Sequence, residues 1–203
     1  GTCDAPPMKL AAYHTAGLVE AGCDEAGRGC LAGPVVAAAV ILPPKLRLPG
    51  LNDSKQLTAA QRERLRPLIE RDAIAWCVAE ASVAEIDRLN ILHASMLAMH
   101  RAIDGLKERP ELLLIDGNRF TPYFGIAHAC VIGGDGRFRS IAAASVLAKT
   151  HRDERMQQLH AEHPQFGWAV NKGYPTVDHR RAIAAHGPCA HHRTSFTLLP
   201  EAR

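Results

Sequence analysis

Residues Glu111 to Asn118 read ELLLIDGN, a short apolar segment that ends at an acidic residue followed by glycine. Four consecutive apolar residues before a turn are typical of a strand buried on both faces, as in the parallel part of an α/β sheet. Asp116 then lies at the carboxyl end of that strand, where open α/β sheets collect their functional groups. The segment predicts a layered fold and the sheet edge at which a site is expected.

Two further acidic positions follow apolar segments beside glycine. A strand predicted over Leu18–Asp24 ends in the adjacent acids Asp24 and Glu25, and Asp135 follows the weaker strand Ile126–Ile132. Each acid alone could be an ordinary turn residue. Together they indicate a carboxylate cluster, which needs a compensating cation. Carboxylate oxygens favour Mg²⁺ or Mn²⁺, and two such ions are a usual device for phosphoryl displacement.

The remaining elements follow from hydrophobic periodicity and from capping residues. They predict an α/β or α+β layer structure with one sheet. We expect strands at Pro34–Leu42 and Ile74–Ser82, and helices at Ala59–Arg71, from Asn90 with an apolar stripe of Leu92, Met96, Met99, Ile103 and Leu106, from Ser140 to about His163, and from Thr176 to the H-G-P at His186.

The charge of the chain is uneven. The net charge is +3, of which residues 1–136 carry −2 and residues 137–203 carry +5. A basic C-terminal third suits a polyanion, although a solvated surface would show the same charge. No apolar run reaches the length of a membrane span, and the first residues lack the apolar core of a signal peptide. We therefore expect a cytoplasmic protein without a membrane segment.

Six cysteines are present, and none forms a C-x-x-C pair. The best candidate for structural zinc is the C-A-H-H run at residues 189–192, but the paired spacing of structural zinc sites is missing. We interpret the cysteines as reduced side chains packed as small hydrophobic groups. No catalytic role is assigned to His191 or His192.

Seven blocks of the sequence resemble bacterial ribonuclease HII, in order from about Leu18 to Phe196. The resemblance implies a ribonuclease H-like fold: a central mixed five-stranded sheet flanked by helices, with a small C-terminal helical segment. It also implies hydrolysis of the RNA strand of RNA–DNA hybrids, and incision on the 5′ side of single ribonucleotides in duplex DNA, leaving 3′-hydroxyl and 5′-phosphate ends. The blocks are GCDEAGRGCLAGPVVAAAVIL, LNDSKQL, EIDRLNILHASMLAMHRAI, LLIDGNRF, AAASVLAKTHRD, KGYPT and HHRTSF.

The resemblance assigns roles to individual residues. The family's four metal-binding catalytic acids correspond to Asp24, Glu25, Asp116 and Asp135, holding two Mg²⁺ or Mn²⁺ ions. Its substrate-sensing G-R-G corresponds to Gly27, Arg28 and Gly29, and its junction-reading tyrosine to Tyr174. Further candidate substrate contacts are Lys55, Ser145, Lys149, Lys172 and Arg193. The family often has Lys-Gly-Asp at the fourth acid, whereas this chain departs from that pattern with Gly-Gly-Asp at residues 133–135.

Three alternatives stay open. The chain could be a hybrid-binding module without activity, a related nuclease that acts on DNA, or an enzyme like ribonuclease HIII without junction specificity. The presence of all four acids argues against the first, and the G-R-G sequence argues against the other two. We expect a monomer with an N-terminal extension (1–16), a catalytic domain (17–175) and a C-terminal helical segment packed on it (176–203).

Overall fold

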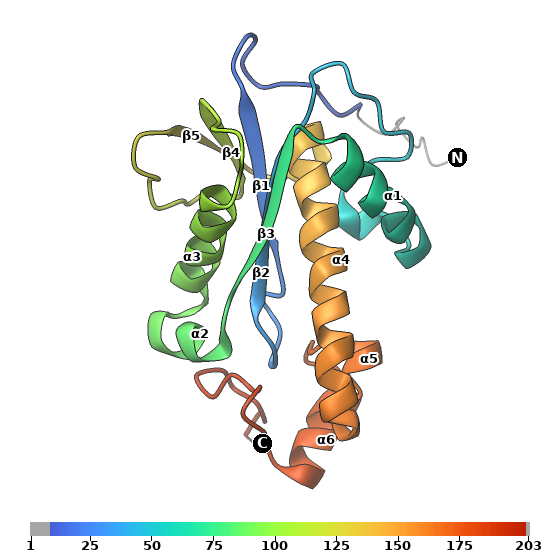
Figure 1. Ribbon diagram of the computed structural model, residues 1–203. Helices are drawn as coiled ribbons and strands as arrows, with labels where there is room; N and C mark the ends of the chain where they lie inside the picture. The colour runs from blue at the N-terminus through green and yellow to red at the C-terminus, as the bar shows by residue number, and fades with distance from the viewer. Residues whose placement is uncertain (1–8, 202–203) are drawn as a thin grey trace, which may run out of the picture. The chain divides into compact units, whose positions relative to one another are not determined.

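The computed structural model describes residues 9–201. These residues form a five-stranded sheet and a set of helices of very different length (Figure 1). The strands are β1 (Glu20–Ala26), β2 (Val35–Ile41), β3 (Ala75–Ala81), β4 (Leu112–Asp116) and β5 (Ala127–Val131). The α-helices are α1 (Ala59–Asp72), α2 (Val83–Leu89), α3 (Ile91–Asp104), α4 (Arg139–Glu162), α5 (Trp168–Asn171) and α6 (Val177–His186), and the 3-10 helices are η1 (Ser54–Gln56), η2 (Gly134–Gly136) and η3 (Pro164–Phe166).

The sheet has the strand order β3-β2-β1-β4-β5. Strand β4 pairs in parallel with β1 on one side and with β5 on the other. Strands β1 and β2 are neighbours joined only by residues 27–34. That connection is too short for the crossover that parallel strands need, so this pair is antiparallel. The sheet is therefore mixed, and the predicted fold class is confirmed.

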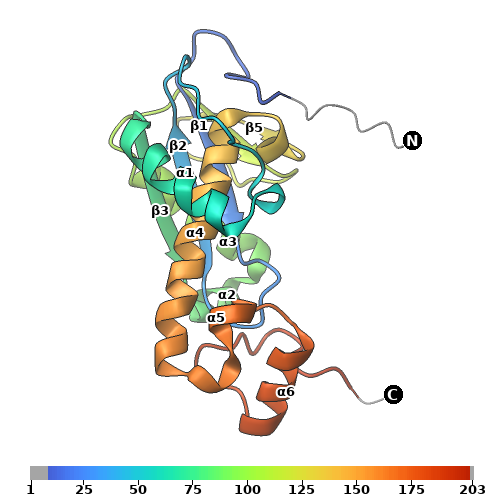
Figure 2. The same ribbon diagram turned by 90° about the vertical axis from the view of Figure 1, so that its right-hand side faces the viewer.

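The chain divides into two compact units. The first contains the residues up to Asp24, Ala39–Trp76 and Leu106–Val146. The second contains Glu25–Ala38, Cys77–Gly105 and the residues from Leu147 onward. Strands β1, β2 and β3 and the long helix α4 each contribute residues to both units. Helix α4 is the longest helix of the described chain (Figure 2).

In the first unit, the start of α4 packs closely against the strands. A buried cluster of apolar side chains joins β4 and β5 to Phe138 and Ile141 at the start of the helix. Gly22 of β1 lies against the helix backbone, because a Cβ atom there would collide with the main chain of Ser140 and Ile141. Glycine at this position allows the helix to approach the strand that leads to Asp24.

In the second unit, the core is aromatic. Phe166 and Trp168 stack with their ring centroids 5.1 Å apart, and Trp168 is fully buried. Met156 and Leu159 of α4 and Ile183 of α6 complete the same cluster. The core thus joins α4 to the segment that follows it.

Most elements lie within one or two residues of their predicted bounds, and three of the predicted caps have a clear physical basis. The side chains of Thr58 and Thr176 accept hydrogen bonds from the backbone N–H of the third residue of α1 and of α6. The side chain of Asn90 accepts the corresponding bond at the start of α3. Helix α2 was not predicted, because its seven residues, about two turns, carry too short an apolar pattern. Its own capping residue is Ser82.

The predicted stripe of α3 is only partly right. Met99 and Ile103 are buried, but the large side chains of Leu92 and Met96 are only partly buried. The face that packs most closely carries small residues instead, namely Ala94, Ser95, Ala98 and Ala102. The prediction placed the large apolar side chains on the buried face. The structure has small residues on that face, because a helix that packs closely against its neighbour needs small side chains at the contact.

The C-terminal part of the chain is less helical than predicted. Helix α6 ends at His186, and from Gly187 to Glu201 the described chain contains no helix. The proposed division at residues 16 and 175 stays a prediction, and residues 1–8 and 202–203 lie outside the described chain, as does Cys3. Over residues 9–201, no helix combines the length and the apolar character that crossing a membrane requires.

Candidate functional site

The sheet itself brings three of the predicted acids together. Strands β1, β4 and β5 are parallel, so their carboxyl ends lie at the same edge. The register of β1 and β4 extends to the residues just before Asp24 and Asp116, which makes these two acids neighbours across the pair. Asp116 also pairs with Val131 of β5, and the turn after β5 carries Asp135 in η2.

The oxygen atoms of these acids converge. One carboxylate oxygen from each of Asp24, Asp116 and Asp135 lies within 4.8 Å of the others. Asp24 and Asp135 are only 5% and 3% exposed, while Asp116 is partly exposed. The backbone N–H of Asp135 donates to Oδ1 of Asp116 at 3.4 Å, which ties the turn to the end of β4.

The cluster is short of positive charge. Burial, a hydrogen bond with Asp53 and the negative charges of Asp116 and Asp53 together raise the pKa of Asp135 to about 6, against the pull of Lys55. Asp53, which caps η1, was not predicted as part of this group. The sequence could have indicated Asp53, because it lies in the L-N-D-S-K-Q-L block, two residues before the predicted contact Lys55.

Lys55 is the cation nearest to Asp135. Its Nζ lies 3.3 Å from Oδ2 of Asp135 and 3.7 Å from Oδ2 of Asp53. Partial burial lowers the pKa of Lys55, but the attraction of these two carboxylates outweighs it, so the pKa is raised. One ammonium group, on a side chain that is 74% exposed, cannot neutralise the four carboxylates of Asp24, Asp53, Asp116 and Asp135.

These donors fit a hard divalent cation. Carboxylate oxygens are the preferred ligands of Mg²⁺ and Mn²⁺, and an ion among them would remove the repulsion that raises the pKa of Asp135. The partly exposed Asp116 leaves the group open to a ligand from solvent. The residues present therefore suit the predicted metal, which Asp24, Asp116 and Asp135 would hold.

Glu25, the fourth predicted ligand, is not among the three acids whose oxygens converge. Its side chain is 11% exposed, and Nη1 of Arg28 lies 3.4 Å from its Oε1. Glu25 belongs to the second unit, whereas Asp24 belongs to the first. Its role as a metal ligand stays a prediction.

The predicted G-R-G segment is held by a buried arginine. Arg193 is fully buried, and its guanidinium donates to the carbonyl oxygens of Gly27 at 2.7 Å, Arg28 at 2.9 Å and Gly33 at 3.0 Å. Burial lowers the pKa of Arg193 to about 10. In this structure, Arg193 supports the backbone of the loop, and the direct substrate contact predicted for it stays a prediction.

A second buried arginine holds the other side of this loop. Arg152 donates to the carbonyl oxygens of Ala32 at 2.9 Å, Pro34 at 3.0 Å and Lys172 at 2.7 Å. Gly27 has a φ of 92°, and a Cβ atom there would collide with the guanidinium of Arg152. This supporting role of Arg152 was not predicted, although the residue lies in the A-K-T-H-R-D stretch of one of the seven blocks.

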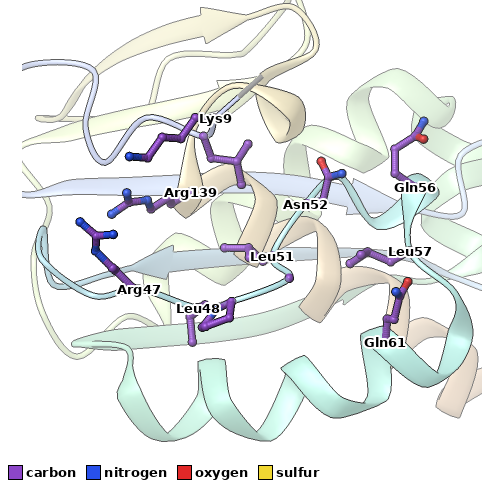
Figure 3. A pocket seen from close by; sticks show the side chains of 12 residues that line it. Lys9, Arg47, Leu48, Leu51, Asn52, Gln56, Leu57, Gln61 and Arg139 are labelled. Carbon is purple, nitrogen blue, oxygen red and sulfur yellow. The ribbon is translucent and has the colours of Figure 1, made fainter. Parts of the chain in front are cut away.

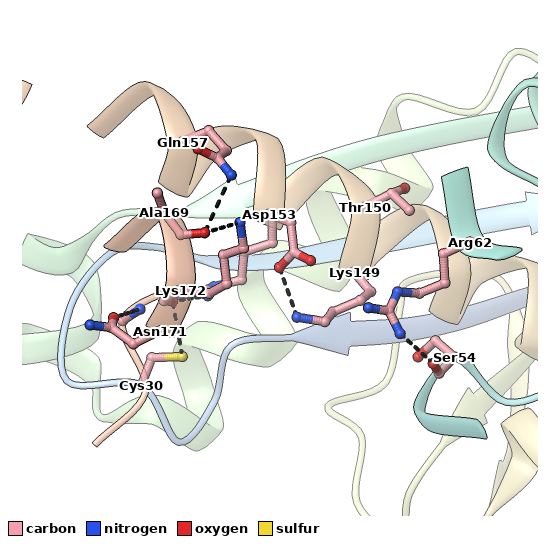
Figure 4. A network of polar contacts seen from close by, with 12 residues as sticks. Cys30, Ser54, Arg62, Lys149, Thr150, Asp153, Gln157, Ala169, Asn171 and Lys172 are labelled. Atoms are coloured by element: carbon pink, nitrogen blue, oxygen red, sulfur yellow. Dashed lines mark hydrogen bonds and ion pairs between the residues drawn. The ribbon is translucent and has the colours of Figure 1, made fainter. Parts of the chain in front are cut away.

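Tyr174 lies among cations in the second unit. It is 37% exposed, and its ring centroid is 5.6 Å from Nζ of Lys149 and 5.9 Å from Cζ of Arg152. Burial and the neighbouring Cys30 raise the pKa of Tyr174, so the phenol is neutral. Lys149 also pairs with Asp153 at 2.7 Å (Figure 4).

The other predicted contacts are engaged in local structure. Nζ of Lys172 donates to the carbonyl of Ala169 at 2.6 Å, and its own carbonyl accepts from Cys30 (Figure 4). Ser145 is buried, and its hydroxyl donates to that of Ser54 at 2.6 Å. The substrate roles of Lys55, Lys149, Lys172 and Ser145 stay predictions, as do those of the G-R-G segment and Tyr174.

The first unit also contains a hollow of about 650 Å³ that the sequence did not predict. Lys9, Arg47 and Arg139 gather at one end of it, and Gln56 and Gln61 lie at the other (Figure 3). Leucine side chains line the space between. The lining contains no acidic residue, so its charge suits an anionic ligand.

Comparison with known proteins gives a consistent result. Residues 21–199 match the family "Ribonuclease HII". The chain is 62% identical to ribonuclease HII of Parabacteroides distasonis over 95% of this chain and 96% of that protein, and 60% identical to that of Cytophaga hutchinsonii over 96% of each. The fold is similar to ribonuclease H2 from Pyrococcus horikoshii OT3, with a TM-score of 0.73 and 25% identity over 88% of this chain and 94% of that one. It is also similar to the structure of a PCNA:RNase HII complex from Archaeoglobus fulgidus, with a TM-score of 0.76 and 26% identity over 91% of this chain and 98% of that one.

These likenesses confirm the predicted family, the ribonuclease H-like fold and the enzyme class, a hydrolase of the endoribonuclease type. Ribonucleases HII depend on a metal and act on RNA–DNA hybrids, which agrees with the acidic cluster at the edge of the sheet. The family match and the identity to bacterial relatives over nearly the whole chain show that the chain belongs to the ribonuclease HII family.

Proposed function

We propose that this protein incises duplex DNA on the 5′ side of a single embedded ribonucleotide, in addition to cutting the RNA strand of hybrids, and leaves 3′-hydroxyl and 5′-phosphate ends. Two Mg²⁺ or Mn²⁺ ions held by Asp24, Asp116 and Asp135, with Glu25 as a further ligand, would activate water and stabilise the leaving oxygen. The convergence of three carboxylates within 4.8 Å carries this proposal.

Recognition of the ribose must come from outside the acidic cluster, because carboxylates and metal ions contact phosphate and not the 2′-hydroxyl. The carbonyls of Gly27 and Arg28 are bound to Arg193, which fixes the loop in one conformation. Space is open around Gly29, since a Cβ atom there would meet nothing within 4 Å. A fixed backbone with an open flank suits close approach of a sugar, whose 2′-hydroxyl is both donor and acceptor.

Tyr174 is proposed to contact the sugar of the following nucleotide. Its exposed ring edge and the adjacent ammonium of Lys149 combine an aromatic surface with a positive charge, the pairing found where proteins bind nucleic-acid strands. A flat ring packs more closely on a deoxyribose than on a ribose. This contact would therefore favour a junction at which RNA is followed by DNA.

The basic hollow supports binding of a longer duplex. Lys9, Arg47 and Arg139 offer three positive charges in one place, and phosphate contacts supply much of the affinity of nucleic-acid-binding proteins. We propose that this hollow contacts the phosphate backbone of the substrate. The binding would then weaken as salt concentration rises.

The test uses end-labelled duplexes with zero, one or four consecutive ribonucleotides, each with Mg²⁺ or Mn²⁺. The expected result is one cut on the 5′ side of the single ribonucleotide, cutting within the four-ribonucleotide tract, and an intact all-DNA duplex. Discrimination of about 10⁴ is expected, since a site built to bind a hydroxyl is left with unpaired polar groups when the hydroxyl is missing. Equal cutting of the all-DNA duplex would refute sugar recognition, and binding of hybrids without any cutting would indicate an inactive binding module.

A further inference from the structure

A second group of metal-type ligands lies in the second unit. One ligand atom from each of Glu162, His163 and His191 lies within 4.8 Å of the others. Glu162 is the last residue of α4, His163 follows it directly, and His191 comes from the segment after α6. His191 begins the H-H-R-T-S-F block, but neither that block nor the acidic cluster accounts for its position beside Glu162 and His163.

The backbones that carry the two imidazoles are fixed. The N–H of His163 donates to the carbonyl of Leu159 at 3.0 Å, which closes the last turn of α4. The carbonyl of His191 accepts from the N–H of Gly33 at 2.9 Å, next to the loop that Arg193 holds. The ligand positions are therefore set by the fold, so binding a metal would order little additional chain.

The two rings are also held by packing. Their centroids are 5.2 Å apart with the planes at 70°, and both lie against the buried Trp168, at 5.8 Å for His163 and 6.1 Å for His191.

We propose that Glu162, His163 and His191 form a binding site for a transition-metal ion of the zinc class. Two imidazoles and a carboxylate are a zinc ligand set, with water completing the tetrahedron. Imidazole is a poor ligand for Mg²⁺, so this site differs in its preferred metal from the group of Asp24, Asp116 and Asp135. Ligand atoms of a tetrahedral site with zinc–nitrogen distances near 2.0 Å lie about 3.3 Å apart, so these atoms need to draw together by at most about 1.5 Å from their 4.8 Å limit.

An ion bound at Glu162, His163 and His191 would connect two segments of the second unit. It would link the end of α4 to the segment that contains Arg193, whose guanidinium holds the carbonyls of Gly27 and Arg28. The bound ion would therefore stabilise the second unit and the loop proposed to read the ribose. Because it binds only the folded protein, it would raise the melting temperature.

The first experiment measures melting temperature of the full chain after removal of metal by a chelator. Zn²⁺ at a hundredfold excess over its Kd is expected to raise Tm by about 5 °C. The shift should persist in Asp116→Asn, which disables the acidic cluster. It should be lost in His163→Ala and in His191→Ala, and be retained in His186→Ala, an exposed histidine outside the group. Mg²⁺ should give the opposite pattern, with its shift lost in Asp116→Asn and kept in His191→Ala.

The second experiment detects the ion directly. The chain has two tryptophans, and in Trp76→Phe the remaining fluorescence comes from Trp168 beside the proposed site. Cu²⁺ or Co²⁺ should quench this fluorescence with a stoichiometry of one per chain. Glu162→Gln changes an exposed side chain and keeps its shape, so it should fold normally and weaken the binding about tenfold.

The two readouts decide the proposal together. Folding of every variant is checked by circular dichroism, and that of the histidine and Glu162 variants also by Mg²⁺-dependent cleavage of a hybrid. Quenching and Tm shifts that are unchanged in the folded His163→Ala and His191→Ala variants would overturn the proposed ligands. Absence of any bound ion at a hundredfold molar excess of Zn²⁺ would overturn the site itself. Neither result depends on whether the protein cuts at single ribonucleotides.

Discussion

The two ligand groups of this protein differ in donor chemistry and in how the chain assembles them. Asp24, Asp116 and Asp135 offer oxygen alone and follow the ends of adjacent parallel strands. His163 and His191 offer nitrogen and come from a helix end and a loop, held together by packing on Trp168. Strand register dictates the first group, so it is visible in sequence. Tertiary packing dictates the second, so it is not.

The groups also differ in charge. The acidic group brings three carboxylates together, and the negative charge of Asp116 contributes, after burial, to the raised pKa of Asp135. The histidine group holds at most one negative charge, on the exposed Glu162. A divalent ion therefore relieves repulsion in the first group, whereas in the second it gains mainly from ligand bonds to nitrogen. The following predictions separate these two effects.

The largest effect is expected for Asp116→Asn. The substitution keeps the shape of the side chain but removes a charge from the centre of the acidic group. We expect turnover to fall by at least about 10³-fold with substrate binding nearly unchanged, since one removed ligand can disable metal-assisted hydrolysis. Single-turnover cleavage and filter binding measure the two quantities.

The matched control for this change is Asp178→Asn, an exposed aspartate on α6. It should cleave like the unaltered protein. Activity of Asp116→Asn within about tenfold of the unaltered protein at saturating Mg²⁺ would remove Asp116 from the site. Loss of Zn²⁺ binding in Asp116→Asn would show that the two groups are not independent.

Asp135→Asn is expected to lower the cleavage rate at least about 100-fold. Asp135 reaches the acidic group from a turn, and the sequence before it departs from the Lys-Gly-Asp common in the family. The buried side chain nevertheless converges with Asp24 and Asp116, so its charge should matter. A rate close to that of the unaltered protein, measured over a range of Mg²⁺ concentrations, would assign the ligand position to another group.

A smaller and selective effect is expected for Tyr174→Ala. Loss of the ring should lower incision at a single ribonucleotide about tenfold and cleavage within a long hybrid about threefold or less, because stacking of a base or sugar on an aromatic ring contributes on the order of 1 kcal/mol. Tyr174→Phe keeps the ring and should retain the preference. Equal losses on both substrates would make Tyr174 a general binding residue.

Strand ends and caps account for what the sequence predicted well. The apolar run before Asp116 and the capping threonines depend on neighbours in sequence, so they give a local signal. The convergence of three acids could also be predicted, because each acid follows an apolar strand segment and the carboxyl ends of parallel strands lie at one edge of the sheet. The resemblance to ribonuclease HII supplied the fold family and the enzyme class beyond these local signals.

The hydrogen bonds by which buried arginines support the second unit could not be predicted from the sequence. Arg193 binds carbonyls more than 150 residues away along the chain, and a basic residue in a sequence gives no sign of whether it faces phosphate or carbonyl oxygen. The C-A-H-H run at residues 189–192 was not predicted to bind zinc, because the paired spacing of structural zinc sites is missing. Glu162 and His163, which lie close to His191, come from the end of α4. Such pairs become visible only when the packing around Trp168 is known.

The smallest effect is expected at Glu85, a carboxylate whose charge is balanced by a side chain of the protein, that of Arg101, and not by a metal ion. Glu85 accepts two short hydrogen bonds from Arg101, at 2.7 and 2.6 Å, and the N3 position of Glu85 completes the capping box of α2. These bonds lower the pKa of Glu85 to about 2, opposite to the shift of Asp135. Because the folded pKa is below the unfolded value of 4.5, the stabilisation is complete above about pH 4.5 and is lost as the pH falls toward 2.

Glu85→Gln should therefore lower the free energy of unfolding by about 1 kcal/mol at pH 7, as expected for one largely exposed ion pair and cap. The difference from the unaltered protein should shrink as the pH falls below 4.5, because protonated glutamate resembles glutamine. Urea unfolding at several pH values measures it, and addition of Mg²⁺ or Zn²⁺ should leave the difference unchanged. If the difference in free energy of unfolding between the two proteins changed with either ion, Glu85 would take part in metal binding, which would contradict the proposed ligand groups.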